Sequence, residues 1–209
     1  MNKSTDRIKS WGEGISYLCQ VDPFLRKWIK SQEDIEVIKL RNSITLHEFL
    51  IRSILSQQLS VAAGNTIAKR FLDLFPKRRI SISDLIEMKP EKIRTAGVSR
   101  NKVFSIKDLA NKIWNKEIPS KRKLEGLSDK EIIDHLTQVK GIGRWTAEIC
   151  LISFLGRMDV LPAEDLIIRK GFASVMNLKE IPPPKMVREH AVRWQPYRTI
   201  AAKILWKAG

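Results

Sequence analysis

The stretch that decides the fold is LTQVKGIGRWTA, residues 136–147, which lies between two segments whose apolar residues recur at helical spacing. Two glycines, Gly141 and Gly143, flank one apolar residue, Ile142. Because glycine tolerates positive φ, the chain can reverse here within a few residues, and Ile142 can fill the space between the helices. The stretch therefore predicts two helices joined by a tight hairpin.

The predicted hairpin has the features of a phosphate-binding site. Backbone N–H groups around residues 141–145 lie at the start of its second helix, where they have no partner within the helix and point outward. Lys140 and Arg144 add positive charge beside them, and such a site holds a nucleic-acid backbone without reading a base. A plain tight turn is the alternative, favoured for an isolated Gly-x-Gly. The residues that we expect at the phosphates are Lys140, Gly141, Gly143, Arg144 and Thr146.

The composition favours a folded, basic protein. The chain has 209 residues, of which 43% are hydrophobic, enough for one large domain or for two small lobes. Its 38 lysines and arginines against 23 acidic residues give a net charge of +15, and such an excess attracts polyanions. Charge alone favours nucleic acid only modestly, because a solubilising surface or an acidic membrane partner would also explain it.

Several classes of site lack the residues that they need. Cys19 and Cys150 are the only cysteines, which excludes a four-cysteine iron–sulfur cluster. The three histidines are far apart in the sequence, so we expect no metal site. No apolar run is long enough to span a membrane, and residues 1–10 lack the apolar core of a signal peptide. We therefore expect no membrane partner and an intracellular protein, cytoplasmic and nucleoid-associated in a prokaryote or nuclear in a eukaryote.

Helical periodicity runs through nearly the whole chain, and we expect an all-α fold. Residues 79–82 are the only short strand-like candidate. The expected helical segments are about 14–31 with a restart at Pro23, 46–75, 82–88, 89–96, 100–115, 128–138, 144–155, 162–176, 184–193 and 197–208. Capping boxes are predicted at two helix starts, Thr45 with Glu48 and Ser128 with Glu131. Basic clusters are expected in loops at 77–79 and 121–123.

A pair of acidic residues follows the hairpin. Pro162 suits a helix start, which would place Glu164 and Asp165 in the first turn, where the helix dipole stabilises anions. By position alone these are ordinary N-terminal acids. The chemistry gives one of them a function, because breaking a base–sugar bond builds positive charge on the deoxyribose. A nearby carboxylate stabilises that charge and can orient or deprotonate a water molecule.

Four motifs occur in order along the chain: ILSQQLS at 54–60, VKGIGRWTA at 139–147, LPAED at 161–165 and WQPYRTIAA at 194–202. Together they resemble the helix-hairpin-helix (HhH-GPD) DNA glycosylase superfamily, most closely its 3-methyladenine DNA glycosylase II branch. The resemblance runs from about Val21 to Trp206. It implies a base excision repair enzyme that flips an alkylated purine, of the 3-methyladenine or 7-methylguanine type, out of DNA. The enzyme would hydrolyse the N-glycosidic bond and leave an abasic site.

The resemblance also implies roles by position. Asp165 matches the catalytic aspartate, and Glu164 matches a less critical residue before it. Gln58 matches the side chain that wedges into the duplex, a task that Leu59 is expected to share. The aromatic positions that line the base pocket are Trp145 and Trp206, on whose faces a cationic base would stack. The tryptophans left as core or surface are Trp11, Trp28, Trp114 and Trp194.

The chain also departs from some members of the superfamily. Bifunctional relatives have a lysine where Trp145 stands, and that lysine forms the Schiff base that leads to strand cleavage. Those relatives often carry a four-cysteine cluster as well. Both differences imply a monofunctional enzyme. The chain begins too close to Gln58 to include the N-terminal β-domain of some relatives, and Ile149 replaces an aromatic residue found in others, which leaves the shape of the pocket open.

The resemblance implies a single glycosylase unit over residues 1–209, built as two helical lobes with a DNA-binding cleft between them. Residues about 45–155, including the hairpin at 136–147, would form a central lobe, and about 1–44 with 156–209 the second. We expect damaged double-stranded DNA as partner, a monomer, and no cofactor, although hairpins of this kind sometimes hold a monovalent cation. The alternatives are a glycosylase for deaminated or mismatched bases, a non-catalytic DNA-binding module, and a structural helical protein.

Overall fold

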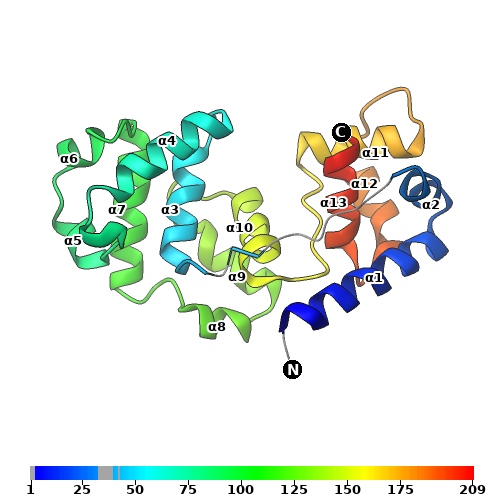
Figure 1. Cartoon of the computed structure of the whole chain (residues 1–209), viewed down its shortest axis with the longest axis horizontal. Helices are drawn as coiled ribbons and strands as arrows, with labels where there is room; N and C mark the ends of the chain where they lie inside the picture. The colour runs from blue at the N-terminus through cyan, green and yellow to red at the C-terminus, as the bar shows by residue number, and fades with distance from the viewer. Residues whose placement is uncertain (1–2, 33–39, 42) are drawn as a thin grey trace. The chain divides into compact units, whose positions relative to one another are not determined.

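The computed structural model describes residues 3–32, 40, 41 and 43–209, with their side chains from Ser10 onward. The regular structure in these residues is helical, without a strand, and confirms the all-α prediction (Figure 1). The strand-like segment at 79–82 is therefore not a strand in the described chain, because a helix already begins at Ile82.

The chain divides into two compact units, Met1–Leu40 with Leu151–Gly209 (unit 1) and Arg41–Cys150 (unit 2). Residues 1, 2, 33–39 and 42 of the predicted second lobe lie outside the described residues. Unit 1 contains α1 (Lys3–Val21), α2 (Pro23–Lys30), the π-helix η2 (Leu151–Leu155), α11 (Leu166–Met176), α12 (Pro184–His190), the 3-10 helix η3 (Ala191–Trp194) and α13 (Arg198–Ala208). Unit 2 contains α3 (Leu46–Ser56), α4 (Val61–Leu72), the 3-10 helix η1 (Pro76–Arg78), α5 (Ile82–Glu87), α6 (Pro90–Arg94), α7 (Arg100–Trp114), α8 (Lys121–Glu125), α9 (Asp129–Thr137) and α10 (Arg144–Cys150). The single-unit assignment and the cleft remain predictions.

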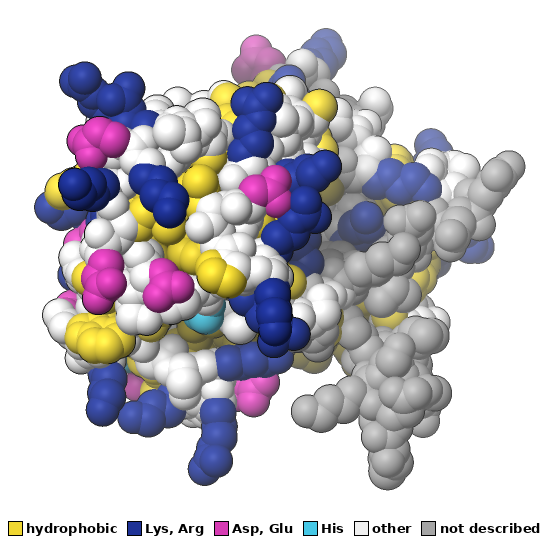
Figure 2. Space-filling model, turned by 60° about the vertical axis from the view of Figure 1, so that its left-hand side comes forward, with side chains coloured by type: hydrophobic (Ala, Val, Ile, Leu, Met, Phe, Trp, Pro, Cys, Tyr) yellow, Lys and Arg dark blue, Asp and Glu magenta, His cyan; other side chains and the backbone are white. Residues whose placement is uncertain are grey.

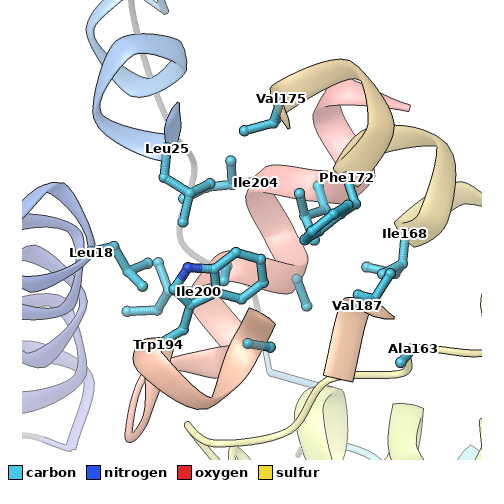
Figure 3. Close-up of a cluster of buried hydrophobic side chains, with 14 of the residues drawn as sticks. Leu18, Leu25, Ala163, Ile168, Phe172, Val175, Val187, Trp194, Ile200 and Ile204 are labelled. Atoms are coloured by element: carbon cyan, nitrogen blue, oxygen red, sulfur yellow. The ribbon is translucent and has the colours of Figure 1, made fainter. Parts of the chain in front are cut away.

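The core of unit 1 forms between α11 and α13, with α2, η3 and α12 packed around them. Figure 3 shows Phe172 and Ile204 within this cluster, near Trp194. The two central helices approach closely at Gly171, where a Cβ atom would overlap the carbonyl group of Leu205. Glycine at this position therefore allows α13 to lie against α11, and that contact determines the surroundings of Asp165.

A buried carboxylate, Asp22, joins α2 to the C-terminal part of unit 1. As N-cap of α2 it accepts hydrogen bonds from the N–H groups of Phe24 and Leu25, at 3.0 and 3.1 Å. Its second oxygen lies 2.7 Å from His190 Nε2 and accepts from Trp194 Nε1 at 2.8 Å. Burial of a carboxylate is unfavourable unless it is hydrogen-bonded, and here both oxygens of Asp22 have hydrogen-bond partners.

Unit 2 is organised around α7, which packs against α3, α5 and α6. Its buried face carries Val103, Ile106 and Leu109 at helical spacing, and the helix α3 that packs against it buries apolar residues such as Ile54 and Leu55. Helices α9 and α10 of this unit pack against each other and flank the hairpin. Ile142, in the hairpin, is buried.

Three sequence expectations need correction. The periodic run at 46–75 is two helices, because the backbone turns at residues 57–60 and Ser60 caps α4 by accepting from Ala63 N. Neither basic cluster lies wholly in a loop, because Lys77 and Arg78 belong to the 3-10 helix η1 and residues 121–123 open the short helix α8. The helix expected from Pro162 begins at Leu166.

The late start of α11 has a clear cause. The N–H of Asp165 bonds back to the carbonyl of Pro162, which closes a turn, and the Asp165 side chain then accepts from the next free N–H groups of the helix. Asp165 is therefore the N-cap, outside the first helical turn, and Glu164 precedes it. The capping box at Ser128 and Glu131 is confirmed in full. At Thr45 only the cap itself forms, because the Glu48 carboxylate pairs with Arg52.

Candidate active site and DNA-binding residues

Asp165 is held through both carboxylate oxygens within unit 1. Oδ1 accepts from Ile167 N at 2.7 Å and from Ile168 N at 3.4 Å. Oδ2 accepts from Trp206 Nε1, on α13, at 3.2 Å. The packing of α13 on α11 thus brings together two of the residues that the resemblance implies, the catalytic carboxylate and one aromatic residue of the base pocket. The carboxylate is fixed in direction before any ligand arrives.

Glu164, the neighbouring acid, has a different environment. Its Oε1 accepts from Arg188 Nη1 of α12 at 2.6 Å, and both side chains are more than half exposed. An exposed ion pair of this kind contributes little to stability. Two adjacent carboxylates are therefore distinguished by their partners, since an arginine neutralises Glu164 whereas Asp165 is anchored by a helix N-terminus and an indole N–H.

The hairpin of unit 2 depends on Gly141. Its φ is +81°, and a Cβ atom there would overlap Oγ of Ser105 on α7. Gly143 differs, because its surroundings leave open space for a Cβ atom. The two glycines of the motif are therefore under different structural constraints. Gly141 is required by the backbone and by its close approach to α7, whereas nothing within unit 2 requires Gly143.

Two N–H groups of the hairpin are already used within the protein. Lys140 N donates to Asp108 Oδ2 at 2.8 Å, and Ile142 N donates to the carbonyl of Val139 at 3.0 Å. This corrects the expectation that the N–H groups of residues 141–145 are all unpaired. Throughout the part of the chain that the structure describes, the N–H groups of Gly143 and Arg144 have no acceptor, so these two N–H groups are available to a phosphate.

The charged side chains of the hairpin are exposed but oriented by neighbours. Lys140 Nζ lies 4.4 Å from the centroid of the Phe104 ring, a cation–π arrangement. Arg144 Nε donates to Glu148 Oε1 at 2.9 Å on the same face of α10. Thr146 is 4% exposed, so a phosphate contact at this residue would have to use its backbone. The space-filling view with unit 2 turned forward shows Lys and Arg side chains spread over the visible face (Figure 2).

The predicted wedge residues lie in the turn between α3 and α4. Gln58 is exposed and has a φ of 56°, a left-handed conformation that is uncommon outside glycine. Leu59 is 39% exposed, so its side chain also lies at the surface of unit 2. The preceding residue, Gln57, donates from Nε2 to the carbonyl of Gly141 at 2.8 Å, so the turn and the hairpin are hydrogen-bonded to each other.

The other predicted pocket residue, Trp145, is 47% exposed on α10. It belongs to unit 2, whereas Trp206 and Asp165 belong to unit 1, so a base pocket shared by both tryptophans remains a prediction. Ile149 is half-buried on the same helix as Trp145. Of the remaining tryptophans, Trp11 and Trp194 are buried, Trp28 packs at the edge of the unit 1 core, and Trp114 is exposed.

Sequence reasoning missed three residues that shape this region: Gln57, Lys102 and Asp108. Gln57 stands inside a motif that the sequence had already singled out, whereas the other two lie in an ordinary amphipathic helix and carry no local signal. Cys150, expected in the core, is buried, and burial raises the pKa of its thiol to about 12. The described residues contain no group of three or more potential metal ligands and no helix that could span a membrane.

Comparison with known proteins identifies the family. The model of the HhH-GPD superfamily base excision DNA repair proteins matches residues 51–196. DNA-3-methyladenine glycosylase 1 of Schizosaccharomyces pombe is 42% identical over 162 residues, which cover 77% of this chain and 71% of that protein. The alkylbase DNA glycosidase-like protein mag2 of the same organism is 35% identical over 167 residues, covering 77% and 76%.

A solved structure is also similar over nearly the whole chain. It is the 3-methyladenine DNA glycosylase Mag1 of Schizosaccharomyces pombe in complex with abasic DNA, with a TM-score of 0.84 at 36% identity, covering 93% of this chain and 95% of that chain. The matched residues 51–196 include the turn at 57–60, the hairpin and Asp165. The chain therefore belongs to the HhH-GPD superfamily of base excision DNA repair proteins, in the branch of the 3-methyladenine DNA glycosylases.

Proposed function

We propose that this protein is a monofunctional DNA glycosylase that removes alkylated purines by hydrolysis of the N-glycosidic bond, with Asp165 as its catalytic carboxylate. The relatives named above support the activity. The observation that carries the residue assignment is the fixation of Asp165 by the N-terminus of α11 and by Trp206. A carboxylate with a fixed direction is what a reaction that develops positive charge on a sugar requires.

The reaction follows from these parts. The damaged nucleotide leaves the base stack, which costs a few kcal/mol and less for a damaged base. The base, cationic after alkylation, stacks on the indole of Trp206, beside Asp165 in unit 1. As the bond from sugar to base breaks with its electron pair going to the base, Asp165 stabilises the developing cation and orients or deprotonates the attacking water. The products are a free base and an abasic site.

The backbone of the DNA is bound by unit 2. The N–H groups of Gly143 and Arg144, the side chain of Lys140 and the guanidinium of Arg144 contact phosphates, while Gln58 and Leu59 fill the gap left by the flipped nucleotide. The partner that this arrangement suits is damaged double-stranded DNA, bound by a monomer. We propose the chromosome as the place of action, in the nucleoid of a prokaryote or the nucleus of a eukaryote.

The proposed reaction is complete without a cofactor, because a carboxylate and a water molecule balance the hydrolysis. A monovalent cation at hairpin carbonyls would help to hold a phosphate and would take no part in bond cleavage. Trp145 supplies no amine, so no Schiff base forms at that position and the strand is left intact. The identity of this residue, together with the absence of a four-cysteine cluster, is the basis for proposing monofunctional chemistry.

The test is release of base from methylated duplex DNA by the wild type and by Asp165→Asn. We expect the wild type to release 3-methyladenine or 7-methylguanine and to nick the strand only after alkali. Asp165→Asn should release at least about a hundredfold less, because the transition-state charge loses its counter-charge. Duplex binding should be unchanged in the variant.

Other outcomes favour the alternatives. Release from deaminated or mismatched bases, but not from methylated DNA, would mean that the pocket around Ile149 accepts a different lesion. Tight binding without release from any of these substrates would indicate a DNA-binding module. Absence of salt-dependent duplex binding would leave only a structural helical protein, since phosphate contacts always make binding depend on salt.

A further inference from the structure

One face of α7 contacts both the glutamine turn (residues 57–60) and the hairpin. Lys102, Ser105 and Asp108 follow one another at intervals of three residues, which places them along the same side of the helix. Lys102 contacts the turn, Ser105 lies against Gly141, and Asp108 accepts from Lys140 N. A single rigid element of 15 residues therefore contacts each of the two segments for which we propose DNA contacts.

Lys102 holds the end of α3. Its Nζ donates to the carbonyls of Leu55 and Gln57, both at 2.8 Å. The last carbonyls of a helix lack partners within the helix, and a cation there is favourable for the helix dipole as well. Burial lowers the pKa of the Lys102 amine, but the carbonyl oxygens around it satisfy its hydrogen bonds. The carbonyl of Gln57 is thereby fixed immediately before Gln58.

The same turn is also hydrogen-bonded to the hairpin, through the side chain of Gln57. Gln57 Nε2 donates to the carbonyl of Gly141 at 2.8 Å, across 84 residues of sequence. Gly141 in turn lies against Ser105 of α7. The contacts form a closed loop that runs from Lys102 to the turn, from the turn to the hairpin, and from the hairpin back to α7. All its members belong to unit 2.

The conformation at Gln58 requires such support. A glutamine at a φ of 56° is not in its preferred backbone region, so the surroundings must impose it. The carbonyl bonds from Lys102 on one side and the N–H of Leu59, which donates to the carbonyl of Ser56 at 3.3 Å, on the other are the contacts that do so. The exposed side chains of Gln58 and Leu59 are then presented from a defined backbone.

We propose that Lys102 and Gln57 are positioning residues that hold the Gln58–Leu59 turn at a fixed distance from the phosphate-binding hairpin, so that the turn enters the duplex where the hairpin binds it. This inference rests on the proposed function, in which the turn and the hairpin contact the same DNA. Neither positioning residue touches the reacting atoms. Their effect is on insertion of the turn, and through it on flipping, rather than on bond cleavage.

The chain supplies a matched control on the same helix. Lys107 donates from Nζ to the carbonyls of Leu85, Ile86 and Met88 at the end of α5, and burial lowers the pKa of its amine as well. It performs the same helix-end role at α5, whose packing is chiefly against α7. Lys102→Met removes two carbonyl contacts at the end of α3, and Lys107→Met removes three at the end of α5, so the control disturbs its helix end at least as much but releases a different segment.

The experiment measures insertion without chemistry. A duplex carries a tetrahydrofuran abasic analogue with 2-aminopurine beside it, and the rise in 2-aminopurine fluorescence reports unstacking when the turn inserts. We expect Lys102→Met to lose most of the fluorescence rise while its Kd for the duplex changes by less than about threefold, because phosphate contacts dominate affinity. Lys107→Met should keep the full rise, and Lys102→Arg should restore part of it.

A second variant covers the case in which Lys102→Met fails to fold. Gln57→Glu keeps the size of the side chain but replaces the donor to Gly141 with a carboxylate, and it should also lose the fluorescence rise. Equal losses in Lys102→Met and Lys107→Met, or a full rise in Gln57→Glu, would overturn the inference. Because the abasic duplex requires no base release, a wild type that inserts but releases no methylated purine would contradict the proposed function and leave this inference standing.

Discussion

The indole Nε1 of Trp206 donates a hydrogen bond of 3.2 Å to Oδ2 of Asp165, across 41 residues of sequence. The other oxygen of this carboxylate is taken by the first N–H groups of α11. The last helix of unit 1 therefore completes the orientation that the N-cap begins. A tryptophan assigned to base stacking also has a role in holding the catalytic group.

Trp206→Phe separates these two roles. It keeps an aromatic face for the base and removes the donor to Asp165. A hydrogen bond to a charged group contributes about 1.5 kcal/mol or more, so we expect single-turnover base release to be roughly tenfold slower. The Kd for duplex DNA should not change. Trp28→Phe is the matched control, because Trp28 packs against the same core of unit 1, and equal slowing in both variants would count against the role of this bond.

The two hairpin glycines should respond differently to alanine. Gly141→Ala places a Cβ atom against Ser105 in a backbone with φ of +81°, and we expect a loss of stability of about 2 kcal/mol or more together with weaker DNA binding. Gly143→Ala meets open space, so its Tm should be unchanged while its methyl group obstructs the approaching phosphate. Thermal melting and fluorescence anisotropy with a short duplex measure the two effects. A lowered Tm in Gly143→Ala would contradict the expected difference between the two glycines.

Unit 1 should lose stability in acid through Asp22, which is 0% exposed. Burial alone would raise the pKa of Asp22, but the hydrogen bonds from His190, Leu25 N and Trp194 outweigh it and lower the pKa below the ordinary value. The unfolded chain therefore binds the proton more readily. The stabilisation is present above a pH of about 4, the ordinary pKa of an aspartate, and is lost as the pH falls through the folded-state pKa.

Asp22→Asn tests this dependence. It should be less stable at pH 7 by about 3 kcal/mol, because several donors lose their charged partner, and its stability should vary less below pH 4. Urea unfolding between pH 3 and pH 7, followed by tryptophan fluorescence, gives both quantities. Asp73→Asn, in an exposed pair with Arg78, is the control and should change little. Parallel pH curves for the wild type and Asp22→Asn would refute the assignment.

Binding of duplex DNA should weaken steeply with salt. Each phosphate contact contributes about 0.9 to the slope of log K against log salt concentration. Arg144→Gln should reduce that slope by about this amount, because the Arg144 guanidinium is exposed on the hairpin. Lys130→Gln, at a side chain 86% exposed and paired with Asp134 on α9, should leave the slope unchanged. A similar change in both variants would mean that the hairpin is not the contact and that only total charge matters.

The sequence predicted features that depend on local chemistry. The hairpin follows from two glycines around a buried Ile142, and the start of α9 follows from Ser128 and Glu131. The all-α class follows from helical periodicity along most of the chain. The first two signals are contained within a few residues and the third is a repeat along the sequence itself, so none of them requires knowledge of the packing.

What the sequence could not predict depends on distant contacts. The break at Gln58 has no glycine to mark it, because the conformation is supported by Lys102, which lies more than 40 residues away in the sequence. The displaced start of α11 reflects the choice of N-cap: the Asp165 side chain accepts from Ile167 N and Ile168 N and so caps a helix that begins at Leu166, rather than one that begins at Pro162. The bond between Asp165 and Trp206 requires the packing of α13 on α11.

The order of the two units along the chain has a consequence for synthesis. Unit 2 occupies one continuous stretch, Arg41–Cys150, whereas unit 1 is assembled from segments on either side of it. Because domains fold as units while the chain emerges from the ribosome, the hairpin and its supports can form while α13 is still missing. A nascent chain therefore completes the hairpin proposed to bind phosphates before Trp206 is synthesised, so the hydrogen bond that orients Asp165, the proposed catalytic carboxylate, forms last.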